Sequence, residues 1–172
     1  MPPFIFGGLY MSKLHQLDYE SPLGVIEIGG TEEGICSIMF TEKDKIENAL
    51  MDDTPDVLKN GFEQLDQYFK GVRQEFTLPF LFDGTDFQKR VWTALTQIPF
   101  AQTGTYKEIA ALLGNEKAVR AVGNANGKNK LSIVIPCHRI VGSNGKLTGY
   151  AGGLWRKEWL LKHEKSFERV KN

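Results

Sequence analysis

The chain has 172 residues, 41% hydrophobic and 24% charged, with a formal net charge of zero, which is enough apolar sequence for one domain or two small ones. The two cysteines lie far apart and the three histidines are scattered, which excludes a disulfide framework and a metal site with recognisable ligand spacing. We therefore expect no metal, no cofactor and a cytoplasmic location, and we expect no membrane insertion because no apolar run approaches the ~18 residues of a membrane span.

The first part of the chain predicts a small α/β lobe. Residues 1–10 are apolar but lack the basic region and cleavage site of a secretion signal, and we interpret them as a disordered extension before Met11, an alternative start. Residues 57–70 carry apolar side chains at helical spacing and predict an amphipathic helix. Three short runs bounded by glycine-containing turns predict an antiparallel sheet, at residues 14–19, 24–29 and 34–40.

The two halves of the chain differ in charge as well as in pattern. Strand-like alternation returns over 74–82 and ends at the turn Asp83-Gly84-Thr85, which we take as the boundary between residues 11–84 and 85–172. Up to Gly84 there are six basic and 15 acidic residues, and after it 15 basic and six acidic ones. A basic half favours binding to a polyanion such as nucleic acid, although the two halves could also simply attract one another.

The second half predicts mostly helices. From Asp86 the apolar period changes to ~3.6 residues, which indicates a helix that ends before Pro99. Residues 106–113 and 116–125 predict two more helices, and the short turn between them makes a helix-turn-helix. A last helix over 154–168 is expected to pack inward through Leu154, Trp155, Trp159, Leu160 and Phe167.

Cys137 is the strongest candidate for chemistry in the sequence. It follows the apolar run 131–135, which we expect to be a strand, and it lies between Pro136 and His138. A cysteine reacts as the thiolate, and we expect the adjacent His138 and Arg139 to stabilise that anion. Cysteine is also common as a small buried hydrophobic residue, and we expect that purely structural role for Cys36.

The segment Pro136-Cys137-His138-Arg139-Ile140-Val141 resembles the signature of the O6-alkylguanine-DNA alkyltransferases, also called methylated-DNA:protein-cysteine methyltransferases. Further similarity follows the family's order over residues 86–164. The resemblance implies a two-lobed α/β fold, with a ribonuclease-H-like N-terminal lobe and a mainly α C-terminal lobe that contains a winged-helix-like helix-turn-helix. The matching blocks are 105–110, 120–125, 150–154 and 157–164.

The resemblance also implies the chemistry. It predicts a single transfer of a methyl or other alkyl group from O6-alkylguanine in duplex DNA to Cys137, with the target base flipped out of the helix; O4-alkylthymine is a further candidate substrate. In the family a water lies between the thiol and an imidazole matching His138, and a carboxylate matching Glu164 orients that imidazole. His163, next to Glu164, is expected to be an ordinary exposed residue.

Four residues match the family's substrate pocket. Tyr106 would direct its hydroxyl to the flipped base, and Ile140 would offer its carbonyl to the guanine amino group. Tyr150 and Ala151 would form the wall of the pocket. Without the resemblance, a tyrosine at the start of a helix and a glycine-rich turn would be read as packing and connection.

Other residues match the family's DNA-binding surface. The third helix carries mostly small side chains, which permit close approach to a minor groove but would equally suit helix packing. Asn115, Ala121 and Gly123 are assigned to that surface, and Arg120 to the space left by the flipped base. Asn129 matches a structural asparagine that ties this helix to the cysteine loop. We expect a monomer on double-stranded DNA.

The chain departs from the family at two positions. Lys130 stands where many members have proline, and Ala151 where many have serine.

Two other functions are compatible with parts of the sequence. A non-catalytic, alkyltransferase-like protein that only binds the lesion is the main alternative, and Cys137 argues against it because such relatives lack the cysteine. A cysteine hydrolase with Cys137, His138 and Glu164 would need an oxyanion hole that the sequence does not reveal.

Overall fold

The computed structural model of the protein describes residues 5–6, 9–10 and 13–168. The chain divides into two compact units, Met1–Phe82 and Asp83–Asn172; the sequence placed the boundary after Gly84. The disordered extension expected at residues 1–10 falls largely outside the described residues and stays a prediction. Within it, β1 (Ile5–Phe6) and β2 (Leu9–Tyr10) pair as antiparallel strands.

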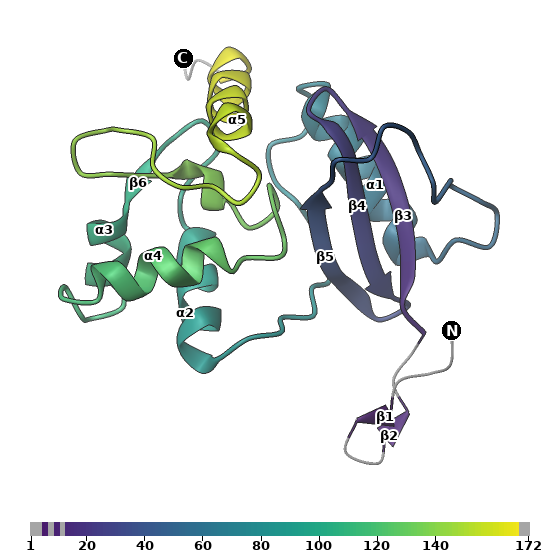
Figure 1. Ribbon diagram of the computed structural model, residues 1–172, viewed down its shortest axis with the longest axis horizontal. Helices are drawn as coiled ribbons and strands as arrows, with labels where there is room; N and C mark the ends of the chain where they lie inside the picture. The colour runs from purple at the N-terminus through teal and green to yellow at the C-terminus, as the bar shows by residue number, and fades with distance from the viewer. Residues whose placement is uncertain (1–4, 7–8, 11–12, 169–172) are drawn as a thin grey trace. The chain divides into compact units, whose positions relative to one another are not determined.

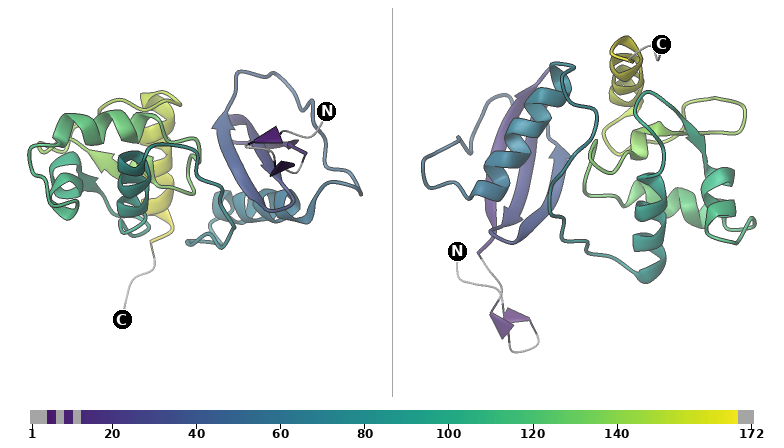
Figure 2. Two further views of the ribbon diagram at one scale, coloured as in Figure 1. Left: turned by 90° about the horizontal axis from the view of Figure 1, so that it is seen from below. Right: turned by 180° about the vertical axis from the view of Figure 1, so that it is seen from behind.

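The N-terminal unit is an antiparallel sheet with one helix across a face, which confirms this part of the predicted fold (Figures 1 and 2). The helix is α1 (Asp56–Phe69), and its inward stripe includes the fully buried Leu58 and Leu65. These side chains pack on the apolar face that alternation gives to the sheet. The strands follow chain order: β3 (His15–Ser21), β4 (Gly24–Thr31) and β5 (Gly34–Phe40).

The alternating stretch 74–82 does not form a full strand. It contributes one parallel bridge, from Phe80 to Ile35, flanked by hydrogen bonds from Ile35 N to Pro79 O and from Leu81 N to Ile35 O. Proline has no N–H to donate and therefore limits strand pairing at this place.

The C-terminal unit is mainly helical, which also confirms the prediction. A capping box between Thr85 and Gln88 starts α2 (Asp86–Leu95). Trp92 fixes this helix to α4 (Val119–Gly127) by donating from Nε1 to the Ala125 carbonyl at 2.8 Å. The third helix begins at Val119, three residues later than expected. The helices are α2 (Asp86–Leu95), α3 (Tyr106–Leu112), α4 (Val119–Gly127) and α5 (Leu154–Ser166) (Figure 1).

The expected strand at 131–135 was wrong. This segment is a series of turns in which Ile133 has a φ of 71°, and the short strand of the region comes later, as β7 (Ile140–Val141) parallel to β6 (Gly104–Thr105). A run of apolar residues does not distinguish a buried strand from a buried turn.

The inward face expected for α5 was also largely wrong. Leu154, Trp155 and Phe167 are 49%, 57% and 41% exposed, and only Leu160 of the predicted set is fully buried. The helix instead turns polar side chains inward: Arg156, Lys157, His163 and Glu164. His163, expected to be exposed, is buried and stacks on Trp159 with 4.8 Å between ring centroids.

Among the described residues, no helix is long and apolar enough to cross a membrane.

Asp18 is a buried carboxylate on β3 that holds the loop after β5. Its side chain accepts hydrogen bonds from Glu47 N at 2.9 Å and Asn48 N at 3.0 Å, and it lies 3.1 Å from Lys43 Nζ. Burial acts to raise the pKa of Asp18, but these hydrogen bonds together hold it below its ordinary value. The ionised carboxylate therefore stabilises the folded unit.

We expect Asp18→Asn to lower the free energy of unfolding by about 1–3 kcal/mol, because the loop amides and Lys43 lose an anionic acceptor. Since the pKa of Asp18 is lowered on folding, this contribution is present above the unfolded value near 3.8 and is lost at lower pH. Denaturant unfolding measures the loss. Glu20→Gln, at an exposed position on the same strand, is the control; an equal effect of both substitutions would contradict the assignment.

Candidate active site

Cys137 begins a single 3-10 turn, η1 (Cys137–Arg139), rather than ending a strand. The residue is 5% exposed, and its amide donates to the Ile135 carbonyl at 2.7 Å. Asn129 fixes the preceding loop, since its side chain donates to Ile135 O at 3.0 Å and accepts from Leu131 N at 2.9 Å. The end of α4 and the cysteine turn are thereby joined through one buried amide side chain.

The groups that favour a thiolate differ from those expected. Burial raises the pKa of the Cys137 thiol, and the Asn129 amide, the positive charge of Lys157 and the Tyr150 hydroxyl act in the opposite direction. The expectation that Arg139 stabilises the thiolate was wrong, because its guanidinium binds elsewhere. Cys36, which we expected to be fully buried, is only half-buried on β5.

His138 and Arg139 both bind the carboxylate of Glu164. His138 Nε2 lies 2.6 Å from Oε2, and Arg139 donates from Nε to Oε1 at 2.8 Å and from Nη2 to Oε2 at 3.1 Å. The backbone amide of Ala101 donates to Oε1 at 3.1 Å. His138 and Glu164 are fully buried, so these partners satisfy the carboxylate without water.

This arrangement fixes the protonation of the pair. Although burial favours the neutral form, His138 and Arg139 hold the pKa of Glu164 well below its usual range, so the group is a carboxylate. Burial lowers the pKa of His138, which makes the imidazole neutral at pH 7, with its hydrogen on Nε2. Nδ1 then carries a lone pair, and this buried atom has no hydrogen-bond partner among the described residues. It can accept a proton.

Lys157 is a candidate site residue that the sequence analysis did not predict. Its side chain is fully buried, and Nζ donates to the Thr148 carbonyl at 2.7 Å. Burial lowers the pKa of Lys157 to about 8, with the Cys137 thiolate acting in the opposite direction, so the ammonium is still mostly protonated at pH 7. Lys157 belongs to the block 157–164 that resembles the family. Helical spacing, however, predicts apolar residues and not this cation on the inward face of the helix.

The predicted substrate residues lie on three segments of the C-terminal unit. Tyr106 opens α3, and its hydroxyl is hydrogen-bonded to Thr148 Oγ1 at 2.8 Å. Tyr150 is half-buried and lies close enough to Cys137 for each group to shift the pKa of the other. Ala151 is exposed beside it, and Ile140 is fully buried immediately after η1.

The predicted DNA-binding residues lie on or before α4. Arg120 and Ala121 are exposed on this helix, and Asn115 is exposed in the turn before it. Gly123 faces the Tyr106 ring, where a Cβ would lie 3.8 Å from the ring carbons. The helix thus presents small side chains and one long cation to solvent.

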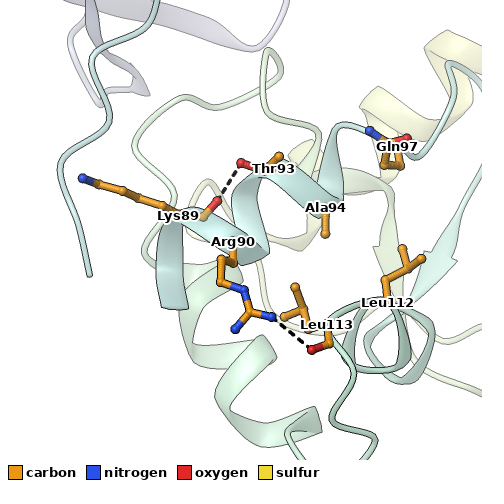
Figure 3. A pocket seen from close by; sticks show the side chains of 7 residues that line it. All are labelled: Lys89, Arg90, Thr93, Ala94, Gln97, Leu112 and Leu113. Atoms are coloured by element: carbon orange, nitrogen blue, oxygen red, sulfur yellow. Dashed lines mark hydrogen bonds between the residues drawn. The ribbon is translucent and has the colours of Figure 1, made fainter. Parts of the chain in front are cut away.

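The described residues contain no further cluster of groups that would suggest a second reactive site. No group of three or more His, Cys, Asp or Glu residues in this part of the chain could hold a metal ion, and the expectation of no metal stays a prediction. A surface groove between α2 and α3 is lined by Lys89, Arg90 and Leu112, among others, and contains none of the predicted site residues (Figure 3).

We expect Glu164→Gln to destabilise the protein by about 3–5 kcal/mol, because Arg139 would remain buried without its anion. Denaturant unfolding is the measurement. Glu158→Gln provides a matched control on the same helix, where the exposed pair with Lys162 contributes about 0–1 kcal/mol. Equal losses in the two variants would show that the buried network does not stabilise the fold.

Comparisons with known proteins agree over nearly the whole chain. Residues 9–82 match the ribonuclease-like domain of 6-O-methylguanine DNA methyltransferase, and residues 86–166 match its DNA binding domain. A methylated-DNA–protein-cysteine methyltransferase of Methanosarcina acetivorans is 47% identical over 86% of this chain and 96% of its own length. The constitutive enzyme of that name in Bacillus subtilis is 42% identical over 85% and 92%.

Solved structures give the same result. The crystal structure of Mycobacterium tuberculosis OGT in complex with DNA has a TM-score of 0.80 and 41% identity, and the match covers 89% of this chain and 94% of that one. The M. tuberculosis O6-methylguanine methyltransferase matches with a TM-score of 0.81 at 38% identity, over 92% and 97% of the two chains. The chain therefore belongs to the 6-O-methylguanine DNA methyltransferase family.

Proposed function

We propose that the protein repairs DNA by transferring a methyl or somewhat larger alkyl group from O6 of guanine to Sγ of Cys137, once per molecule. The single observation that carries the proposal is the turn at Cys137, in which a buried thiol is followed directly by an imidazole whose Nδ1 is open and whose Nε2 is fixed by Glu164. The retained cysteine favours this reaction over lesion binding without transfer.

The reaction is a displacement at carbon. The thiol loses its proton to His138 Nδ1, through a bridging water in the family's arrangement, and the thiolate attacks the alkyl carbon as the carbon–oxygen bond breaks. The guanine leaves with the bonding electrons and takes up one proton, so the thiol hydrogen and the alkyl group are exchanged overall. Lys157 stabilises the thiolate by its charge, and Tyr106 supports the flipped base. A thioether is a poor leaving group, so Cys137 is not regenerated.

DNA binding is assigned to the helix-turn-helix of α3 and α4, with α4 in the minor groove. The exposed small residues of α4 permit close approach, and Arg120 is long enough to occupy the space of the extruded base. We further assign a winged-helix-like form to this unit and a ribonuclease-H-like form to the N-terminal sheet. The free cysteines fit a reducing cytoplasm, and a monomer suffices because the described site lies within one unit.

Incubation with duplex DNA that contains O6-methylguanine is expected to replace one hydrogen of the protein by one methyl group. Intact mass measures the stoichiometry, and peptide mass locates the methyl on Cys137. Cys137→Ser should bind the duplex without gaining mass, and Cys36→Ser should react fully. An unchanged wild-type mass with retained binding would favour the lesion-binding alternative.

Arg120→Ala is expected to slow transfer from the duplex by on the order of tenfold or more, because extrusion of the base costs a few kcal/mol without a side chain in its place. Transfer from a single-stranded substrate should be nearly unchanged, since no base pair must be broken. Rapid-quench measurements on the two substrates make the comparison. Equal slowing on both, or none on the duplex, would contradict this role for Arg120.

A further inference from the structure

The first turn of α5 is electrostatically unusual. It contains Arg156 and Lys157, both buried, it has no acidic residue, and no side chain caps its N-terminus. Cations near the positive end of a helix dipole are unfavourable, and burial of a charge adds to that cost. The proximity of Lys157 to the thiol accounts for the burial of its charge. Arg156 has no such role in the proposed reaction.

Arg156 is held in place from two directions. Nη1 donates to the Gly152 carbonyl at 3.0 Å, and the guanidinium carbon lies 4.6 Å from the centroid of the Trp155 ring. Trp155 is 57% exposed while Arg156 is only 6% exposed, so the indole covers the guanidinium on its solvent side. A planar guanidinium can stack on an aromatic ring and donate in its own plane at the same time.

The carbonyl that Arg156 binds belongs to the turn that carries Tyr150. Gly153 N donates to Tyr150 O at 2.9 Å, and Gly153 adopts a φ of 93°, a conformation that favours glycine. Gly152 lies inside this closed turn, so a hydrogen bond to its carbonyl fixes the peptide plane between Gly152 and Gly153. The turn cannot shift without breaking that bond.

Tyr150 is the link from this turn to the reacting sulfur. Burial raises the pKa of Tyr150 well above its ordinary value, the charge of Cys137 raises it further, and the positive charge of Arg156 opposes both. The hydroxyl therefore stays protonated, and its oxygen is a buried atom near the cysteine. A small displacement of the turn would move this hydroxyl away from the sulfur.

We propose that Trp155 and Arg156 form a clamp on the turn Tyr150–Gly153, and that this clamp positions the Tyr150 hydroxyl against Cys137. Arg156 is thus a positioning residue that acts through Tyr150. The inference rests on the proposed function insofar as the turn forms a wall of the alkylguanine pocket, but Tyr150 and the thiol influence the pKa of each other without DNA.

A double-mutant cycle between Arg156→Met and Tyr150→Phe tests the clamp. All variants carry Cys36→Ser, so that Cys137 is the single thiol. The first readout needs no DNA: it is the rate at which iodoacetamide alkylates Cys137, followed by intact mass. The second is the limiting rate of methyl transfer from an O6-methylguanine duplex, measured separately from the affinity for that duplex. Lys162→Met removes an exposed cation from the same helix and serves as the control.

Each single substitution in the cycle is expected to slow both reactions by roughly three- to tenfold, with duplex affinity unchanged. The double variant should be no slower than the slower single one, because coupled residues are non-additive. Trp155→Ala, at an exposed position, should slow alkylation with Tyr150 present and have no effect with Tyr150→Phe. It keeps the test available if Arg156→Met does not fold.

The two proposals fail in different ways. Multiplicative effects in the iodoacetamide cycle, or an alkylation rate unaffected by Tyr150→Phe, would overturn the clamp whether or not methyl transfer occurs. A non-additive cycle would support the clamp even if the wild-type protein accepted no methyl group from DNA, in which case the proposed function alone would fail.

Discussion

The buried carboxylate of Glu164 is the group on which the proposed active site depends. It receives hydrogen bonds from η1, through His138 and Arg139, and from the Ala101 amide, while its own backbone belongs to α5. Three segments distant in sequence thus meet at one side chain. Because its oxygens are satisfied by donors, it remains ionised, and the same ionisation places the imidazole hydrogen on Nε2 and leaves Nδ1 free to act as a base.

Burial of the thiol is consistent with a protein that reacts once. A cysteine spent in a side reaction is lost for repair, and a thiol that is 5% exposed with a raised pKa reacts slowly with electrophiles in solution. The groups that favour the thiolate are arranged around it: Asn129, Lys157 and Tyr150. In the proposed reaction, an alkylguanine would meet a nucleophile whose base and charge partners already lie in place.

Local sequence patterns predicted the fold well in those segments where buried side chains recur at a single regular spacing, either every second residue or at helical spacing. The strands β3 to β5 follow from alternation, and α1 and α2 from helical spacing. The same reasoning failed at residues 131–135, where burial comes from a turn closed by Asn129, and at α5, where apolar spacing pointed Leu154 and Trp155 inward. The inward cations of α5 have partners at Thr148 and Gly152, and the sequence does not reveal such partners before the chain is folded.

The sequence was informative about the residues of the site and less so about their connections. Cys137, His138 and Glu164 were chosen from motifs, and they lie together on η1 and α5. Arg139 was expected beside the thiolate, but it neutralises Glu164 instead. Lys157 and Arg156 were missed because a charged residue in a helix is usually solvated, and only their burial sets them apart.

Nitrogen NMR of His138 in the unreacted protein tests the central claim most directly, because the two ring nitrogens report which of them carries hydrogen. The account predicts a neutral imidazole at pH 7, protonated on Nε2 and with an unprotonated Nδ1. An imidazolium, or a neutral ring protonated on Nδ1, would contradict it, since neither form could take the proton of Cys137.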